Sequence, residues 1–224
     1  AEMPEKLAEL QRLWLIEATK YQVLPMDDRT GERLNPDLAG RPTLIRGNTQ
    51  LFYAGMGRLS ENSVVSIKNK SFSVTAEVTV ADGVTASGVL IAQGGRFGGW
   101  AVHVVDGALT FTYNVLGIQW FDVTATTPVP SGTHQLRAEF AYDGGGLAKG
   151  GTVTLFHDGA EVGTGRVEAT QPMVFSADET TDIGDDYGMP VSADYAGASR
   201  FNGRIDVVQI DVGDDDHSHL IDPE

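Results

Sequence analysis

Hydrophobic residues near the start of the chain recur with the period of an amphipathic α-helix. They share one face of the expected helix and are Leu7, Leu10, Trp14, Ala18 and Tyr21, with Leu13 and Ile16 widening the stripe. Pro4 suits the first turn of such a helix, and Pro25 stands shortly after its expected end. The pattern predicts one N-terminal helix of about four or five turns.

From about residue 42 onward, apolar and polar residues alternate instead. The alternation is clearest in residues 71–80, 109–115 and 135–140. Strands of this kind have one dry and one wet face, as the strands of antiparallel sheets do. Residues 89–92 and 205–212 are expected to be more deeply buried. We therefore predict a mainly β protein, an antiparallel β-sandwich of the jelly-roll or concanavalin A-like type, preceded by one N-terminal α-helix.

Asp-Gly pairs separate several of these runs. Asp106-Gly107 and Asp158-Gly159 have β-like sequence on both sides. Because glycine readily adopts the positive φ that a primed turn needs, both pairs predict two-residue β-hairpins.

Composition removes several classes of function. The 224 residues include 16 Lys and Arg against 31 Asp and Glu, a net charge of −15. This balance argues against nucleic acid or an anionic membrane as partner, because phosphate binding needs clustered cations. The chain has no cysteine, which excludes disulfides and thiolate chemistry. No recognisable signal peptide precedes residue 4, and we expect the chain to be a segment of a longer protein, bacterial and either cytoplasmic or exported.

Several motifs resemble bacterial arylsulfatases of the type I sulfatase family. The sequence from 4 to 10 (PEKLAEL), Leu13-Trp14 and the sequence from 21 to 29 (YQVLPMDDR) are similar to the end of that family's catalytic domain. The remaining matches are similar to its C-terminal extension and are found at 46–48 (RGN), 55–62 (GMGRLSEN), 67–71 (IKNKS), 140–146 (FAYDGGG), 175–182 (FSADETTD) and 208–211 (VQID).

The resemblance implies a parent enzyme that hydrolyses sulfate esters. Its nucleophile is a formylglycine made from a [CS]-x-P-x-R motif, and it works beside a calcium ion in the catalytic domain. This chain has no such motif, so we expect it to be inactive alone and assign it no catalytic residue. Residues 1–34 would be the terminal helix and connector of the missing catalytic domain. Residues 35–224 would form an accessory β-sandwich that supports or covers that domain, its expected partner.

Acidic residues cluster in one glycine- and threonine-containing loop. They are Asp178, Glu179, Asp182, Asp185 and Asp186, and their oxygens could hold calcium. A solvated loop, or one that contacts the missing domain, is the simpler interpretation. His217 and His219 in the acidic tail could bind a transition metal, although a solvated tail is the simpler interpretation there too. The remaining histidines, His103, His134 and His157, are expected to be ordinary strand residues.

Aromatic residues suggest an alternative function, a carbohydrate-binding, lectin-like β-sandwich module. Arg96, Phe97 and Trp100 form the one cluster with a cation beside aromatic rings. Trp120, Phe121 and Tyr113 are further aromatic residues in the same region, and the alternation predicts at least half of these rings in the core. A third alternative, a glucanase-like hydrolase, needs two carboxylates at catalytic separation. Glu139 and Asp143 could be chosen, but so could many others.

The helix has one further consequence. If the catalytic domain is missing, the Leu7, Leu10 and Trp14 face has lost part of its cover. We expect this face either to pack back on the sandwich or to make an intermolecular contact, such as self-association.

Overall fold

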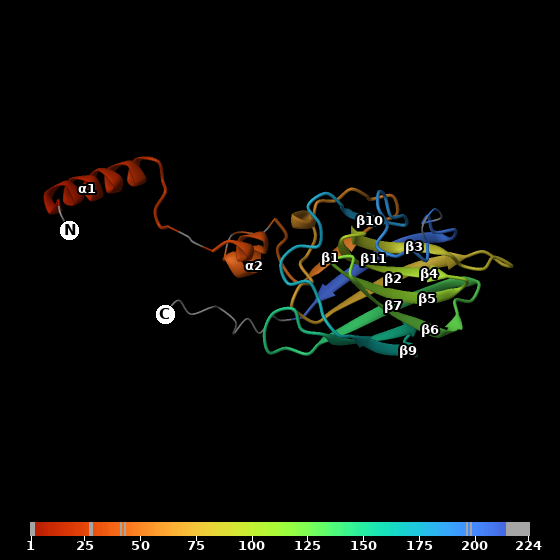
Figure 1. The fold of residues 1–224 in the computed structure, drawn as a ribbon. Helices are drawn as coiled ribbons and strands as arrows, with labels where there is room; N and C mark the ends of the chain where they lie inside the picture. Colours follow the sequence, from red (N-terminus) through yellow and green to blue (C-terminus); the bar gives the residue numbers. More distant parts are fainter. Residues whose placement is uncertain are drawn as a thin grey trace.

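The computed structural model describes residues 3–26, 29–40, 42, 44–195, 197 and 199–213, and it contains two antiparallel sheets packed face to face (Figure 1). Six strands form one sheet in the order β1-β11-β2-β7-β8-β9, and five form the other in the order β10-β3-β4-β5-β6. The strands are β1 Thr49–Phe52, β2 Phe72–Val80, β3 Gly88–Gly95, β4 Gly98–Val105, β5 Ala108–Val115, β6 Gln119–Pro128, β7 Gly132–Tyr142, β8 Gly151–His157, β9 Ala160–Val167, β10 Thr181–Ile183 and β11 Arg204–Val212. This arrangement confirms the predicted antiparallel β-sandwich.

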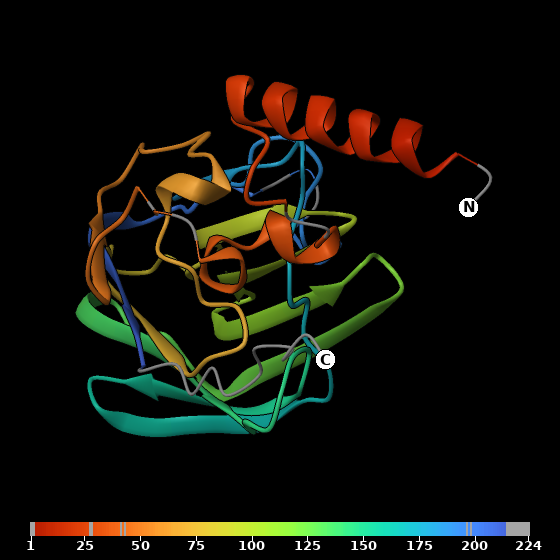
Figure 2. The ribbon, with the colours of Figure 1, turned by 90° about the vertical axis from the view of Figure 1, so that its left-hand side faces the viewer.

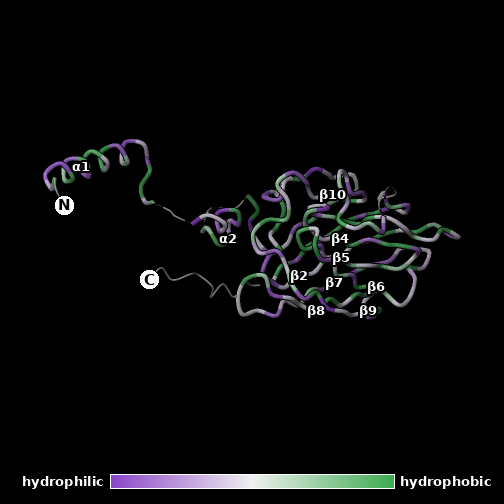
Figure 3. The backbone as a smooth tube through the Cα atoms, viewed as in Figure 1, coloured by the Kyte–Doolittle hydropathy of each residue, from purple (hydrophilic) through white to green (hydrophobic). Residues whose placement is uncertain are grey.

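The core lies between the two sheets, where the apolar residues of the alternating strands meet. Figure 3 shows hydrophobic segments along the strands, interrupted by hydrophilic ones. At the centre, the Phe72 ring lies 5.8 Å from Trp100, 6.2 Å from Phe111 and 5.2 Å from Phe140, measured between ring centroids. Because strand side chains alternate between faces, the residues between these core positions point outward from each sheet.

The two Asp-Gly hairpins are confirmed. Asp106 and Gly107 have φ values of 50° and 84°, and Asp158 and Gly159 have values of 48° and 81°. Positive φ at both central residues is the geometry of a type I′ turn, which matches the twist of the strands on either side. The turns connect β4 to β5 and β8 to β9.

The N-terminal helix α1, Pro4–Lys20, confirms the helical prediction but lies away from the sandwich (Figures 1 and 2). Ala18 is its only buried residue, and Trp14 is 47% exposed. The other exposed apolar side chains of α1 are Leu7, Leu10, Leu13, Leu15 and Ile16. The expectation that this face packs back on the sandwich is therefore wrong, because the following segment carries the helix away from it. The alternative, an intermolecular contact, stays a prediction. None of the described helices has the length and apolar character needed to cross a membrane.

A short connector attaches to the end of the sandwich and contains η1, Gly31–Leu34, and α2, Pro36–Ala39. Asn35 caps α2 by accepting from the Asp37 N–H, and its own amide donates to the Pro172 carbonyl at 2.9 Å. Lys70 forms an ion pair with Asp37 at 3.2 Å. A third short helix, η2, Glu61–Ser63, lies in the segment before β2. The predicted domain division between residues 34 and 35 stays a prediction.

Candidate functional site

The outer face of the five-stranded sheet carries a row of polar side chains. Core and outer positions alternate along β4, β5 and β6, and cross-strand pairing places His103 beside Thr110, Thr112 beside Asp122, and Asn114 beside Trp120. The outward residues of these strands are Ala101, His103, Thr110, Thr112, Asn114, Trp120, Asp122 and Thr124. The strands β4 and β5 are covered on this face, whereas Trp120, Asp122 and Thr124 on the edge strand β6 are exposed.

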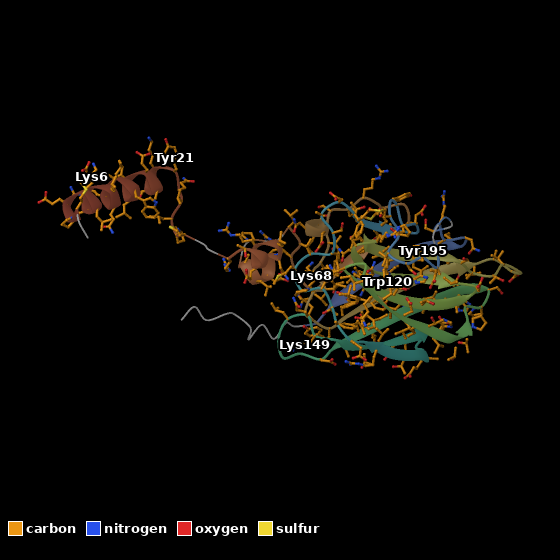
Figure 4. All side chains as sticks on the ribbon, viewed as in Figure 1. Lys6, Tyr21, Lys68, Trp120, Lys149 and Tyr195 are labelled. Carbon is orange, nitrogen blue, oxygen red and sulfur yellow. The ribbon has the colours of Figure 1, made fainter. Side chains whose placement is uncertain are left out.

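The cover is formed by residues 184–195, which we call the covering segment. Val191 and Tyr195 are 1% and 4% exposed and pack on Ala92 and Ala101 in a small hydrophobic cluster of their own. The Tyr195 ring also meets the His103 ring edge-on, with 4.8 Å between centroids. Figure 4 shows Tyr195 and Trp120 on the same part of the sandwich. The covering segment therefore buries one half of the outer face and leaves the half around Trp120 open.

A buried carboxyl group holds the covering segment in shape. Asp186 Oδ2 accepts hydrogen bonds from the Tyr195 hydroxyl at 2.7 Å and from the Val191 N–H at 3.0 Å. Burial is the largest influence and raises the pKa of Asp186 to about 6, while the Tyr195 and Val191 bonds act in the opposite direction. Burial likewise raises the pKa of the Tyr195 hydroxyl, which therefore stays a donor at neutral pH.

A chain of hydrogen bonds runs beneath the covering segment to the exposed edge. The Thr112 hydroxyl donates to Asp122 Oδ1 at 2.6 Å, and His103 Nε2 lies 2.8 Å from the same hydroxyl oxygen. Because the single Thr112 proton is used on Asp122, Nε2 of His103 must donate. Burial lowers the pKa of His103 to about 4, so the ring is neutral at pH 7 and its proton is on Nε2. Among the described residues its Nδ1 has no hydrogen-bond partner.

Trp120 is the exposed aromatic residue of this face. Its ring is 43% exposed, and its Nε1–H donates to the Val191 carbonyl at 3.1 Å, which fixes the orientation of the indole. Asp122 and Thr124 follow it on the same face of β6, at alternate positions of the strand. The result is a fixed aromatic surface with a carboxylate and a hydroxyl beside it.

Two hairpin tips meet at the same end of the sheet. The buried Asn114 amide donates to the carbonyls of Gly95 and Arg96, each at 3.0 Å, and thereby joins the β3–β4 turn to β5. In the β5–β6 turn, a Cβ added to Gly117 would lie 2.6 Å from the Arg96 carbonyl oxygen, so only glycine allows this approach. The exposed apolar side chains at these tips are Phe97, Leu116 and Ile118.

The predicted Arg96, Phe97 and Trp100 cluster does not exist as an exposed surface. Trp100 is fully buried among core aromatic residues, and its Nε1–H donates to Gln93 Oε1 at 2.9 Å. It points inward because Trp100 and Val102 are two residues apart on β4 and therefore lie on the same, core-facing side of the strand. Arg96 and Phe97 are exposed at the hairpin tip, and ligand contact by them stays a prediction. The structure supplies Trp120 instead, which alternation could have identified because Trp120 lies out of phase with the inward residues Phe121 and Val123.

The acidic loop does not gather its carboxylates. Asp182 accepts from the Arg58 N–H at 2.5 Å, Glu179 from the Met189 N–H at 3.3 Å, and Asp185 from the Ser199 hydroxyl. In the part of the chain that the structure describes, no group of three acidic or histidine side chains is placed to hold a metal ion. Asp178, Glu179, Asp182, Asp185 and Asp186 therefore do not converge on one ligand site among the described residues. Calcium binding stays a prediction, and His217 and His219 lie outside the described residues.

The carboxylates considered for hydrolysis are occupied by ion pairs. Glu139 lies 2.7 Å from Arg137, and Asp143 lies 2.7 Å from Arg166. The Arg166 guanidinium holds the pKa of Asp143 below its usual value. A carboxyl whose pKa is lowered, such as that of Asp143, is not suited to be the proton donor that a glycosidase pair requires.

The comparisons with known proteins agree with a lectin-like β-sandwich. Residues 56–211 match the family model Laminin_G_3, described as the concanavalin A-like lectin/glucanases superfamily. The chain therefore belongs to the concanavalin A-like lectin and glucanase superfamily. None of the curated proteins matches the sequence. The comparisons do not link the chain to arylsulfatases or other sulfatases.

Solved structures with low sequence identity also match this chain, with TM-scores below 0.5. Domains LG4-5 of the mouse laminin alpha1 chain are 14% identical, with a TM-score of 0.44, and cover 75% of this chain and 40% of that one. The Ruminococcus gnavus IT-sialidase CBM40, bound to alpha2,3 sialyllactose, is 14% identical with a TM-score of 0.48, covering 78% and 96% of the two chains. Domain 4 of the Geobacillus stearothermophilus arabinanase AbnA, in complex with arabinotriose, is 18% identical with a TM-score of 0.44, covering 66% and 63%. The chain thus spans less than half of the laminin fragment.

Proposed function

We propose that this chain is a non-catalytic carbohydrate-binding module that uses the exposed half of its outer sheet face. The observation that carries the proposal is the fixed, exposed indole of Trp120 with Asp122 and Thr124 beside it. Membership of the lectin and glucanase superfamily supports the same class of function.

The chemistry of the site suits a sugar. An aromatic ring offers a flat surface to the apolar C–H face of a pyranose, and hydrogen bonds to hydroxyl groups then fix its orientation. Asp122 uses Oδ1 on Thr112, while Oδ2 has no hydrogen-bond partner among the described residues and can accept from a sugar hydroxyl. The Val191 contact already fixes the Trp120 ring, so little side-chain entropy is lost when a ligand stacks on it.

Isothermal titration calorimetry of the purified chain against a panel of neutral and acidic oligosaccharides tests this proposal. Loss of the aromatic stacking partner should weaken binding about tenfold, so we expect Trp120→Ala to lower the affinity for any oligosaccharide that the wild type binds by about that factor. Trp14→Ala is the matched control, because it removes an indole that is 47% exposed on α1 and should leave binding unchanged. An affinity that Trp120→Ala leaves unchanged would overturn the proposal.

A second candidate function is that of an accessory domain in an arylsulfatase. The observation that favours it is α1, an amphipathic helix whose exposed apolar face is not covered by any described part of the sandwich. The apolar face of an amphipathic helix is normally packed against another surface. A sulfatase catalytic domain of the kind whose terminal helix α1 resembles would supply that cover.

Complex formation with a separately expressed arylsulfatase catalytic domain tests this second candidate. Sedimentation velocity should show a complex with the wild-type chain and none with a Leu10→Glu, Trp14→Glu double variant, because both side chains are half-exposed on α1. Aryl sulfate hydrolysis by the chain alone would contradict a non-catalytic role in either proposal.

A further inference from the structure

A polar cavity lies at the end of the sandwich that receives the connector. It has a volume of about 370 Å³, within the range of cavities that bind small ligands. Figure 4 shows Lys68, one of its lining residues, at the end of the sandwich next to α2. The connector, the segment before β2 and the end of β11 each contribute to its wall. Trp120 does not line this cavity, so it is a separate site from the outer sheet face.

The cavity is positively charged, although the protein is strongly acidic. The charged side chains that line it are Arg46, Lys68 and Lys70 against Asp37 and Glu61. Two of the cations are neutralised, because Lys68 forms an ion pair with Glu61 and Lys70 forms one with Asp37. Arg46 has no ion-pair partner among the described residues, so one net positive charge remains in the cavity of a chain with a net charge of −15.

The wall around this charge is rigid. Lys68 is 4% exposed, and its ammonium group also lies 4.9 Å from the centroid of the Phe175 ring. The second carboxylate oxygen of Glu61 accepts from the Phe175 N–H at 2.9 Å. Because burying an ion pair costs desolvation energy, such a pair persists only where its surroundings fix it firmly. The Lys68–Glu61 pair therefore gives the cavity a fixed polar wall.

Unused hydrogen-bond donors point to the kind of ligand. Arg46 is exposed, and its guanidinium offers several N–H donors in a planar fork that matches a carboxylate or sulfate group. Asn62, also at the cavity, has a side-chain amide without a hydrogen-bond partner in the described part of the chain. Aromatic residues are absent from the lining of this cavity, so its recognition would be electrostatic and polar rather than by stacking.

We propose that this cavity binds a small ligand carrying a carboxylate or sulfate group, with Arg46 as the principal anion contact. The group could belong to an acidic monosaccharide or be a free oxyanion, and the two sources share the same recognition chemistry. The net positive charge of the cavity is opposite in sign to the net charge of the rest of the chain. Anion binding by this protein would therefore not arise from non-specific attraction by its overall charge.

Calorimetric titrations at constant ionic strength with glucuronate, glucose 6-sulfate, glucose and sodium sulfate test the inference. We expect at least one acidic sugar or sulfate itself to bind, and glucose to bind at least tenfold more weakly than its acidic counterparts. Arg46→Ala should weaken the anion's binding tenfold to about a hundredfold, the range for a lost charge-assisted hydrogen bond. Lys149→Ala removes the same charge outside the cavity and should leave the affinity unchanged.

The results separate this inference from the proposed carbohydrate function. Binding of sulfate as tight as that of the sugar acids identifies the free oxyanion as the ligand, whereas a preference for the sugar acids identifies the sugar. Trp120→Ala should leave the affinities for sulfate and for the sugar acids unchanged. No anion binding, or binding that Arg46→Ala leaves intact in a folded variant, would overturn the inference. Anion binding lost in Trp120→Ala but retained in Arg46→Ala would place the ligand on the outer sheet face and also overturn it.

Discussion

Replacing Asp186 by asparagine tests the electrostatics that hold the covering segment on the sheet. The Asp186 carboxyl is 7% exposed, and its Oδ2 accepts from both Tyr195 and Val191. An asparagine Oδ1 can accept the same two hydrogen bonds without carrying a charge. We therefore expect Asp186→Asn to fold as the wild type does and to be more stable at neutral pH.

The size and direction of this stability change follow from the pKa of Asp186. Burial raises the pKa of Asp186 from 3.8 to about 6, so between these values the folded state holds the proton more readily than the unfolded state. Stability from this group is thus fully present below about pH 4 and is lost as pH rises through about 6. A pKa change of this size corresponds to about 3 kcal/mol. The gain in unfolding free energy of Asp186→Asn over wild type should grow from near zero at about pH 4 to about 2–3 kcal/mol at pH 7.

A second buried group, His103, also changes the stability in this pH range, so Asp186→Asn must be compared with the wild type at each pH. Burial lowers the pKa of His103 from 6.5 to about 4. The stability from its neutral form is present above pH 6.5 and is lost as pH falls through about 4. As pH rises from about 4 to about 6, His103 therefore raises the unfolding free energy while Asp186 lowers it. The pH dependence of the wild type alone shows only the sum of these two contributions. Subtracting the wild-type curve from that of Asp186→Asn removes the His103 contribution, because the histidine is present in both proteins.

The assay is urea unfolding followed by tryptophan fluorescence, repeated at closely spaced pH values from about 4 to 7. Asp194→Asn is the control, because it makes the same charge change at an exposed position of the covering segment. Because this side chain is exposed, Asp194→Asn should change the unfolding free energy little. A constant difference for Asp186→Asn across the interval would refute the reasoning, as would a loss of stability at pH 7.

Three further outcomes follow from the packing. Trp100→Ala should lower the unfolding free energy by about 4 kcal/mol in urea denaturation, because it opens a core cavity and leaves the Gln93 amide oxygen unpaired. A loss below about 1 kcal/mol would contradict the buried placement of Trp100. Lys68→Met should destabilise by about 3–5 kcal/mol because the nearly buried Glu61 loses its partner, and adding Glu61→Gln should restore part of the loss. The Leu10→Glu, Trp14→Glu double variant should leave the thermal midpoint of the sandwich unchanged, because α1 lies away from it; a clear downward shift would show that the helix packs there.

The fold could be predicted from the sequence because its signals are local. Alternation in β2, β5 and β7 sets which side chains face the core, and Asp106-Gly107 and Asp158-Gly159 set two hairpin turns. The helical period of α1 is equally local. Whether another part of the protein covers α1 is not set by the helix sequence alone, because it depends on the path of the chain after the helix. Of the two expected covers for its apolar face, packing back on the sandwich is not observed, and the intermolecular contact stays a prediction.

The candidate site was harder to predict because it depends on which face each residue occupies and on what covers that face. Arg96, Phe97 and Trp100 are neighbours in sequence, but Trp100 faces the core, whereas the hairpin tip is exposed. Trp120 becomes a fixed surface only through the Val191 carbonyl, which belongs to a segment about seventy residues later in the chain. Spacing within the acidic loop likewise could not show that Asp186 turns inward to Tyr195.

The central claim is that the exposed indole of Trp120 is the sugar-binding surface, and the chain is well suited to a direct test. It contains three tryptophans, which lie on α1, in the core and on the outer sheet face. A two-dimensional nitrogen–proton NMR spectrum of the labelled protein therefore resolves three indole N–H signals, assignable by single substitution. On titration with an oligosaccharide identified by calorimetry, the account predicts that the Trp120 signal shifts in proportion to occupancy while the Trp14 and Trp100 signals stay in place. An unmoved Trp120 signal at saturation would contradict it.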